Sequence, residues 1–298
     1  MVFEFTRRKF LADGALTVGA LAASPCVLAA GAVTAKRVSK MQLGLVTYLW
    51  GKDWDLTTLI DNCTKSNVLG VELRSTHKHG VERELNAAQR QKVKQQFADS
   101  PVTCVGIGSN ERFDNPDLAV VKQAIAATKE FIVLSHDVGG SGVKVKPDKF
   151  YDEVPKEQTT AQIGIALNEL AEFGAGYGQE IRLEVHGRYN HLPDIRSILD
   201  VADHENVKVC WNSNQQDLAG EGLEHNFHLV SNRFGATCHI HELDSENYPY
   251  QELINLLVEM DYSGWLLLEC SSEPSDPLAA LSDQLVVFDQ LVARAQST

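Results

Sequence analysis

The sequence predicts a single parallel β/α barrel, a (β/α)8 fold. Short apolar runs typical of strands alternate with longer runs typical of helices, which is the pattern of a parallel α/β protein. Eight such pairs follow one another, and about 260 residues remain once an N-terminal leader is set aside, the usual size of one barrel. No proline- or serine-rich linker divides the chain. We therefore expect one domain over residues 41–298.

The first 32 residues are predicted to be an export signal. Residues 6–11 read TRRKFL, a twin-arginine pattern, and an Ala- and Gly-rich apolar stretch over 15–32 follows it. A membrane anchor is the alternative, but this stretch is less hydrophobic than the ~20 strongly apolar residues of a good span. We expect residues 1–32 to form a cleaved twin-arginine signal peptide, and the mature protein to be exported to the periplasm.

The strands and helices can be placed in order from these patterns. Strand runs are short and rich in Val, Leu and Ile, as in QLGLVTYL and WLLLEC. The closing helix begins at Pro277, behind a Ser- and Asp-rich turn that is a usual start signal. The predicted strands are 42–49, 69–74, 102–108, 142–146, 181–187, 207–212, 236–243 and 264–270. The predicted helices are 55–66, 84–98, 116–134, 158–175, 193–203, 221–230, 249–260 and 276–295.

Composition excludes several classes of protein. The formal net charge is −13, and no Lys/Arg cluster lies outside the leader, so binding to nucleic acid by charge is not expected. No membrane attachment is expected after cleavage, and an oligomer is possible. The mature chain has an odd number of cysteines without C-x-x-C spacing, which favours buried free thiols over disulfides or a zinc ribbon. These cysteines are Cys63, Cys104, Cys210, Cys238 and Cys270.

One glycine-rich segment, 138–142, does not predict a nucleotide site. It precedes a strand, whereas a phosphate-binding loop opens a helix. We expect it to let a loop pack tightly at the mouth of the barrel, with His136 and Asp137 in the same loop.

Four successive strands in the second half of the chain end in a possible metal ligand. Because the carboxyl ends of all barrel strands meet on one face, these side chains are predicted to converge there. A set of two carboxylates, one imidazole and one amide suits a divalent cation such as Mn²⁺, Co²⁺, Zn²⁺ or Mg²⁺. The predicted ligands are Glu184, Asn212, His241 and Glu269.

Strand alternation identifies the neighbours of these ligands. Residues at i and i+2 share a face, so Glu184 lies beside His186 and His241 beside His239. Trp211 is then expected to point the other way, under the helices.

These motifs resemble the xylose isomerase-like barrel family, which includes ketose 3-epimerases, other sugar isomerases and apurinic-site endonucleases. The matching motifs are LEV at Glu184, VCW before Asn212, HIH at His241 and LLLE at Glu269. In the epimerases the ligands are Glu, Asp, His and Glu. This chain departs from them at Asn212, and at Gln215, where they often have His. One anion fewer is expected to lower metal affinity.

The resemblance implies proton transfer next to a carbonyl. In the epimerases the two residues that match Glu184 and Glu269 exchange protons at the carbon beside a ketone. A divalent cation stabilises the enediolate that forms, and a positioned carboxylate acts as general base. We therefore expect Glu184 and Glu269 to be catalytic. Further polar residues on the barrel face are predicted to bind the sugar: Glu72, Arg74, His79, Lys144, His186 and Gln215.

Three functions follow from this reasoning. The first is an exported sugar isomerase or epimerase that acts on a non-phosphorylated sugar or glycoside, because phosphorylated metabolites are scarce outside the cytoplasm. The second is a lyase or hydrolase of 3-keto-glycosides that works by β-elimination with the same residues. The third is an inactive periplasmic sugar-binding barrel, an alternative suggested by Asn212 in the place of the aspartate ligand.

Overall fold

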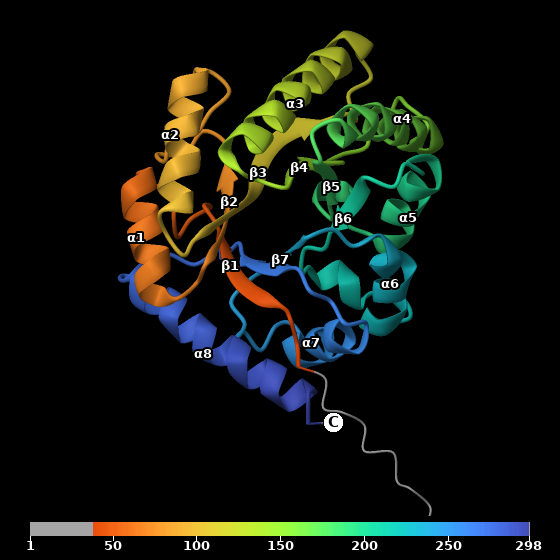
Figure 1. Ribbon diagram of the computed structural model, residues 1–298. Coiled ribbons are helices and arrows are strands. Elements are labelled where there is room, and N and C mark those ends of the chain that lie inside the picture. The colour runs from red at the N-terminus through yellow and green to blue at the C-terminus, as the bar shows by residue number, and fades with distance from the viewer. Residues whose placement is uncertain (1–37, 298) are drawn as a thin grey trace, which may run out of the picture. The chain divides into compact units, whose positions relative to one another are not determined.

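Parallel strands form a ring at the centre of the molecule, and α-helices surround this ring (Figure 1). The computed structural model describes residues 38–297. Its sheet runs in the order β6-β5-β4-β3-β2-β1-β8-β7, and bridges Val209↔Phe234 and Asn212↔His239 join β6 to the β7 side. This confirms the predicted (β/α)8 barrel. The strands are β1 Gln42–Val46, β2 Gly70–Arg74, β3 Thr103–Arg112, β4 Gly142–Lys146, β5 Glu180–Glu184, β6 Val207–Cys210, β7 Thr237–Ile240 and β8 Trp265–Leu268.

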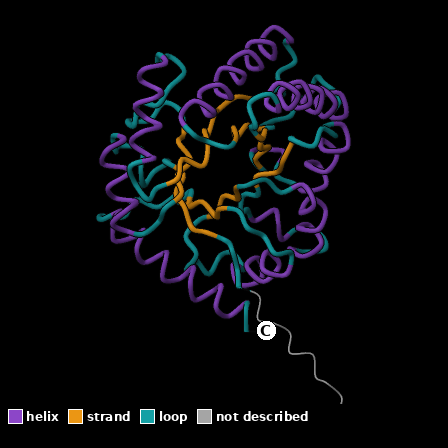
Figure 2. The backbone as a smooth tube through the Cα atoms, in the orientation of Figure 1, coloured by secondary structure: helices purple, strands orange, loops and turns teal. Residues whose placement is uncertain are grey.

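A helix follows each strand and packs outside the ring, as the separate layers of Figure 2 show. The α-helices are α1 Leu56–Ser66, α2 Ala87–Ala98, α3 Leu118–Val138, α4 Lys156–Ala175, α5 Leu192–Val201, α6 Leu223–Val230, α7 Tyr250–Glu259 and α8 Pro277–Ala295. Short 3₁₀ helices occupy Gly187–Tyr189, Gln215–Leu218 and Ser231–Arg233. None of the helices in the described part of the chain is long and apolar enough to cross a membrane. The predicted signal peptide, residues 1–32, lies outside the described residues.

The start of a helix is often set by a single side chain. Asp55 accepts a hydrogen bond from the backbone of Thr58 at the start of α1. Asn86 and Gln89 form a reciprocal capping box at the start of α2. Such caps satisfy backbone N–H groups that have no partner inside the helix. They explain why helices begin close to the predicted positions.

Two predictions about the α3–β4 region were wrong. His136 and Asp137 lie in the last turn of α3, which extends to Val138 and ends at Gly139 with a left-handed φ of 94°. The glycine-rich segment leads from α3 into the start of β4, so it lies at the amino end of the strands and not at the barrel mouth. The reason is that two adjacent glycines stop a helix, and the segment ahead of them keeps an apolar face.

The outer and inner faces of the strands differ as predicted. Trp211 is buried against Phe227 and Phe234, at ring distances of 5.8 and 5.9 Å, under the helices. The five cysteines of the described chain are free and buried, which also confirms the prediction. The inner face instead carries charged side chains that are fully buried, including Glu72, Lys144 and His239. Such burial is costly unless the charges are paired, so the inner face is where the site lies.

Candidate active site

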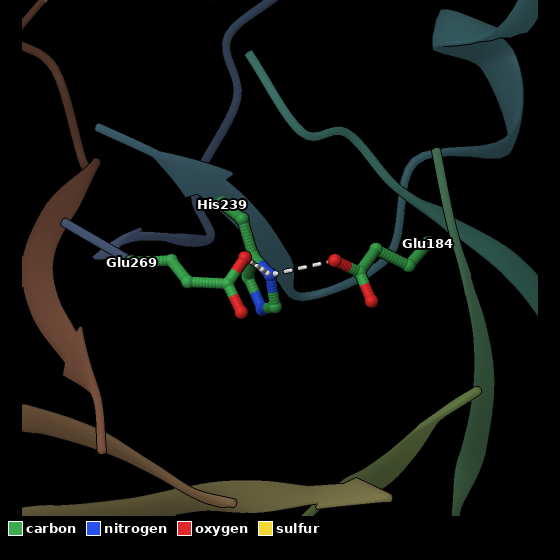
Figure 3. Close-up of side chains that lie close together, drawn as sticks. All are labelled: Glu184, His239 and Glu269. Atoms are coloured by element: carbon green, nitrogen blue, oxygen red, sulfur yellow. Dashed lines mark hydrogen bonds and ion pairs between the residues drawn. The ribbon is translucent and has the colours of Figure 1, made fainter. Parts of the chain in front are cut away.

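Charged side chains fill the barrel near the carboxyl ends of its strands. Glu184 is the last residue of β5, His239 lies in β7, and Glu269 directly follows β8. One ligand-type atom from each of these three lies within 4.8 Å of the others. Figure 3 shows the two carboxylates approaching the ring of His239 from opposite sides. Distant parts of the sequence therefore meet at a single point, although the histidine of this triad is His239 and not the predicted ligand His241.

His239 contacts carboxylates with both ring nitrogens. Nδ1 lies 3.2 Å from Oε2 of Glu269 and 3.7 Å from Oε1 of Glu184, and Nε2 lies 3.2 Å from Oε1 of Glu72. Burial alone would lower the pKa of His239, but Cys210 and the surrounding carboxylates outweigh it and raise this pKa well above its ordinary value. His239 therefore acts as a buried cation that holds the carboxylates in place.

Lys144 supplies a second buried cation. Its Nζ lies 2.8 Å from Oε2 of Glu184, and both side chains are fully buried. Burial alone would raise the pKa of Glu184, but Lys144 and then His239 hold it well below its ordinary value. Burial and the charge of Glu184 oppose ionisation of Glu269, yet His239 and Lys144 hold its pKa below the ordinary value as well. Both glutamates are therefore carboxylates.

Asn212, just after β6, bridges the two glutamates. Its Nδ2 donates to Oε1 of Glu184 at 2.9 Å and to Oε2 of Glu269 at 3.3 Å. Because a carboxylate can only accept, these contacts set the orientation of the amide. Oδ1 of Asn212 is left buried without a hydrogen-bond partner among residues 38–297. A buried oxygen of this kind is uncommon and is free to bind a ligand.

His241 offers one free ring nitrogen. Its Nδ1 lies 3.0 Å from the backbone oxygen of Glu269. A carbonyl oxygen only accepts, so Nδ1 carries the proton and Nε2 carries the lone pair. Histidines that bind metal commonly donate their other N–H in this way, which fixes the ring orientation. His241 thus has the tautomer that a metal ligand needs.

These residues open onto a cavity of about 350 Å³ at the carboxyl ends of the strands. Its size falls in the range of small-molecule sites. Glu269 lines the cavity, whereas Glu184 lies beneath it, without exposed surface. The lining residues are Tyr48, Arg74, Lys146, His186, Asn212, Asn214, His241, Glu269 and Ser271.

Four residues predicted to bind substrate lie outside this lining. Glu72 and Lys144 are buried below it, against His239 and Glu184. The ring of His79 donates to the backbone oxygen of Arg74 and accepts from the backbone of Val81, and burial lowers its pKa to about 4. His79 therefore supports the loop after β2.

The fourth is Gln215, on the rim of the barrel. It donates to the backbone oxygen of Asn247 and does not reach the cavity. Arg74 and His186, by contrast, line the cavity, as expected from their strand positions.

Sequence reasoning assigned no role to several residues of the site. His239 had been placed on the same face as His241. Lys146 lies two residues after Lys144 on β4, and this spacing of two was the available signal. Tyr48 and Ser271 were not singled out. Ser271 lies in the loop after β8, and Tyr48 lies in the loop after β1, although the predicted strand ran to residue 49.

Comparison with known proteins identifies the family. Residues 60–290 match the model of the xylose isomerase-like TIM barrel family, and the chain belongs to this family. A search of curated protein sequences finds no match.

Solved structures share the fold at low sequence identity. The 3-keto-D-glucoside 4-epimerase of E. coli is 15% identical with a TM-score of 0.72, covering 84% of this chain and 100% of its own. An L-ribulose 3-epimerase is 15% identical with a TM-score of 0.73, covering 86% and 96%. The IolI protein with a bound zinc atom is 15% identical with a TM-score of 0.72, covering 86% and 99%. At this identity the likeness establishes the fold.

Proposed function

We propose that the protein is a divalent-metal-dependent sugar isomerase or epimerase that removes a proton next to a carbonyl. The observation that carries this proposal is the pair of ionised carboxylates, Glu184 and Glu269, beside a free amide oxygen and a free imidazole nitrogen. Two of the similar structures are described as epimerases of a keto-glucoside and of L-ribulose, and a third holds zinc. These descriptions support the proposal.

The predicted ligand set, Glu184, Asn212, His241 and Glu269, fits a divalent cation. Oδ1 of Asn212 and Nε2 of His241 are without hydrogen-bond partners among residues 38–297, and the two carboxylates are ionised. His239 is close enough to be a ligand, but both its nitrogens contact carboxylates, so we assign it to orienting them. When bound, the cation would stabilise negative charge on the substrate oxygens.

The two glutamates are placed to move a proton in opposite directions. Contacts of Glu269 with Asn212 and His239 involve Oε2, which leaves Oε1 for a proton from a substrate in the cavity. Glu184 lies on the other side of His239 and is kept ionised by Lys144. We propose that Glu269 removes the proton, and that the proton returned from the other side passes from the ammonium group of Lys144 to Glu184 and on to the substrate, while the proton on Glu269 later restores Lys144. Positioned acid–base groups of this kind are worth about 10²–10⁴-fold in rate.

The test is proton exchange in D₂O. The purified protein is first analysed for bound metal and then incubated with ketoses and 3-keto-glycosides, and deuterium uptake is measured by NMR. We expect deuterium in a retained sugar, and a loss of about 10²–10⁴-fold in Glu269→Gln and Glu184→Gln. Glu205→Gln, an exposed site, is the control.

Other outcomes would identify the alternatives. Release of an aglycone would indicate a 3-keto-glycoside lyase or hydrolase. Absence of both reactions in metal-loaded protein, with a sugar bound, would indicate a binding protein.

We also propose that the protein acts in the periplasm, on non-phosphorylated sugars or glycosides. The support is the twin-arginine pattern at Arg7 and Arg8. Replacing both by lysine should retain the protein in the cytoplasm, which cell fractionation would measure; unchanged export would contradict the proposal.

A further inference from the structure

One wall of the active-site cavity carries cationic groups that no carboxylate fully neutralises. Arg74 at the end of β2 and Lys146 at the end of β4 both line the cavity. The opposite part of the lining holds Asn212, His241 and Glu269, which belong to the proposed reaction centre. The cavity thus has a reactive side and a cationic side.

Arg74 makes no ion pair within residues 38–297. Its guanidinium carbon lies 5.0 Å from the ring centre of Tyr48, and Nη1 lies 3.2 Å from Nε2 of His77. An arginine only donates hydrogen bonds, so this histidine nitrogen is the acceptor and the ring is neutral. The two contacts hold the side chain in position without cancelling its charge. Most of its five N–H donors remain for a ligand.

Lys146 is similarly held by a neutral partner. Its Nζ lies 3.2 Å from Nε2 of His186, which must accept, because an ammonium group only donates. The other ring nitrogen of His186 lies 3.1 Å from Oδ1 of Asp148 and donates to it. The nearest carboxylate oxygen to Lys146 is Oε2 of Glu184, at 3.9 Å, and Lys144 already pairs with that oxygen at 2.8 Å. Lys146 is only 5% exposed, so its ammonium group is buried, with no carboxylate oxygen within residues 38–297 closer than this 3.9 Å contact.

We propose that the substrate carries a carboxylate, as a sugar acid does, and that Arg74 and Lys146 bind this group. The inference rests on the proposed function and narrows its substrate class. A planar guanidinium can bind a carboxylate through two parallel hydrogen bonds, and a buried ammonium adds a third. The carboxylate would then fix the far end of the sugar while its carbonyl end faces Glu269.

A carboxylate fits this wall better than a phosphate. Phosphate sites are commonly built from backbone N–H groups of a glycine-rich turn at a helix N-terminus. None of the cavity-lining residues is a glycine. The anion is therefore expected to be held by side chains alone.

Equilibrium binding to matched ligands tests this inference. Calorimetry compares D-fructose with D-fructuronate and D-glucose with D-glucuronate, which differ only in a –CH₂OH or –COO⁻ group, together with inorganic phosphate. We expect the acids to bind about 10- to 100-fold more tightly than the neutral sugars, as for hydrogen bonds to charged groups. Arg74→Gln and Lys146→Met should each reduce this preference about tenfold, while Lys146→Arg should keep most of it.

Two control substitutions remove an arginine charge and a lysine charge at positions away from the cavity. Arg196→Gln on α5 and Lys92→Met on α2 should leave the preference unchanged, since both residues lie away from the cavity. Equal affinity for acid and neutral sugar in the wild type would overturn the inference, as would an intact preference in both Arg74→Gln and Lys146→Met. Phosphate binding more tightly than the sugar acids would overturn the assignment to a carboxylate.

The same samples distinguish this inference from the proposed function. Deuterium exchange into neutral sugars without a preference for acids would overturn only the carboxylate site. Acid preference that depends on Arg74 and Lys146, without any exchange, would support the carboxylate site and overturn the proposed isomerase activity.

Discussion

Asn212 is the residue at which this site differs most clearly from the epimerase pattern. Its amide donates to Glu184 and Glu269 and still leaves Oδ1 without a partner. An aspartate in this position could not donate and would place a third anion beside the two glutamates. Asparagine therefore allows the two carboxylates to pack together in the absence of an ion. A bound cation would in turn have one negatively charged ligand fewer than in the epimerase pattern.

Asn212→Asp should make the protein more dependent on metal. We expect metal affinity to rise on the order of tenfold, because ligand charge tunes cation binding. Without metal, the buried and unpaired anion should destabilise the fold by about 1–3 kcal/mol. Titration calorimetry with Mn²⁺ and thermal unfolding with and without EDTA measure both effects. Asn255→Asp, an exposed site on α7, is the control. Unchanged metal affinity would remove Asn212 from the ligand set.

Lys144→Met should be strongly destabilising. Lys144 and Glu184 form a fully buried pair, and removal of one partner of such a pair typically costs about 3–5 kcal/mol. Lys129→Met removes a partly exposed partner of Glu169 and should cost no more than ~1 kcal/mol. Urea denaturation at pH 7 measures both. Equal and small losses would contradict the importance assigned to the buried pair.

The same variant should also respond differently to acid. In the folded protein the pKa of Glu184 lies below its ordinary value of 4.5, so its contribution to stability is present above pH 4.5 and is lost as the pH falls. The stability difference between wild type and Lys144→Met should therefore be largest near neutral pH and shrink below pH 4.5. A difference that stays constant with pH would show that Lys144 acts through packing alone.

Glycine is required in a barrel strand where a large side chain of another strand packs directly against its backbone. Gly70 begins β2 and pairs with Gly44 of β1, and Trp265 begins β8 on the other side of β1. A Cβ atom on Gly70 would overlap the ring of Trp265. The absence of a side chain at Gly70 thus lets this indole lie inside the amino end of the barrel.

Gly70→Ala should destabilise the protein through this overlap. Overpacking of a core typically costs about 1–3 kcal/mol, and the large fused ring of Trp265 has little freedom to move. Gly176→Ala is a matched control, because the nearest atom to its added Cβ is a backbone oxygen at 3.5 Å and its φ of −63° suits alanine. Melting temperatures should fall for the first substitution and stay near the wild-type value for the second. An unchanged melting temperature for Gly70→Ala would show that the strand ends can shift freely.

The order of elements was predictable from sequence, but the depth of side chains along each strand was not. All eight strands and eight α-helices overlap the ranges that apolar period and capping residues predict, although α3 continues to Val138, past its predicted end at residue 134. Alternation also placed His239 and His241 on one face, yet it could not tell which of them contacts the carboxylates. Which histidine makes this contact depends on the stagger of neighbouring strands. The stagger places His239 at the level of Glu72, Glu184 and Glu269. His241 lies nearer the carboxyl ends of the strands, where it lines the cavity.

Over the whole molecule, the free energy of unfolding should depend on pH through groups whose contributions change in opposite directions as the pH rises. Glu184 and Glu269 have lowered pKa values and favour folding at higher pH. Burial lowers the pKa of His79 to about 4, so its contribution is also lost as the pH falls below 6.5. Asp217 acts in the opposite sense. Burial raises its pKa to about 7, despite hydrogen bonds from the backbone of Asn214 and the hydroxyl of Tyr248.

Asp217→Asn isolates the opposing contribution of this carboxyl group. As the pH rises from 3.8 to about 7, the unfolded chain loses the Asp217 proton while the folded protein keeps it, so stability falls across this window. An amide resembles the protonated carboxyl group, since its oxygen can accept from Asn214 and Tyr248 and it does not ionise. We expect Asp217→Asn to gain stability relative to wild type from pH 4 to pH 7, as measured by melting temperature at each pH. The exposed Asp61→Asn should show no such trend. Parallel curves for Asp217→Asn and wild type would mean that Asp217 is ionised in the folded protein at neutral pH, with the loops after β6 and β7 joined by a charged hydrogen bond instead of a neutral one.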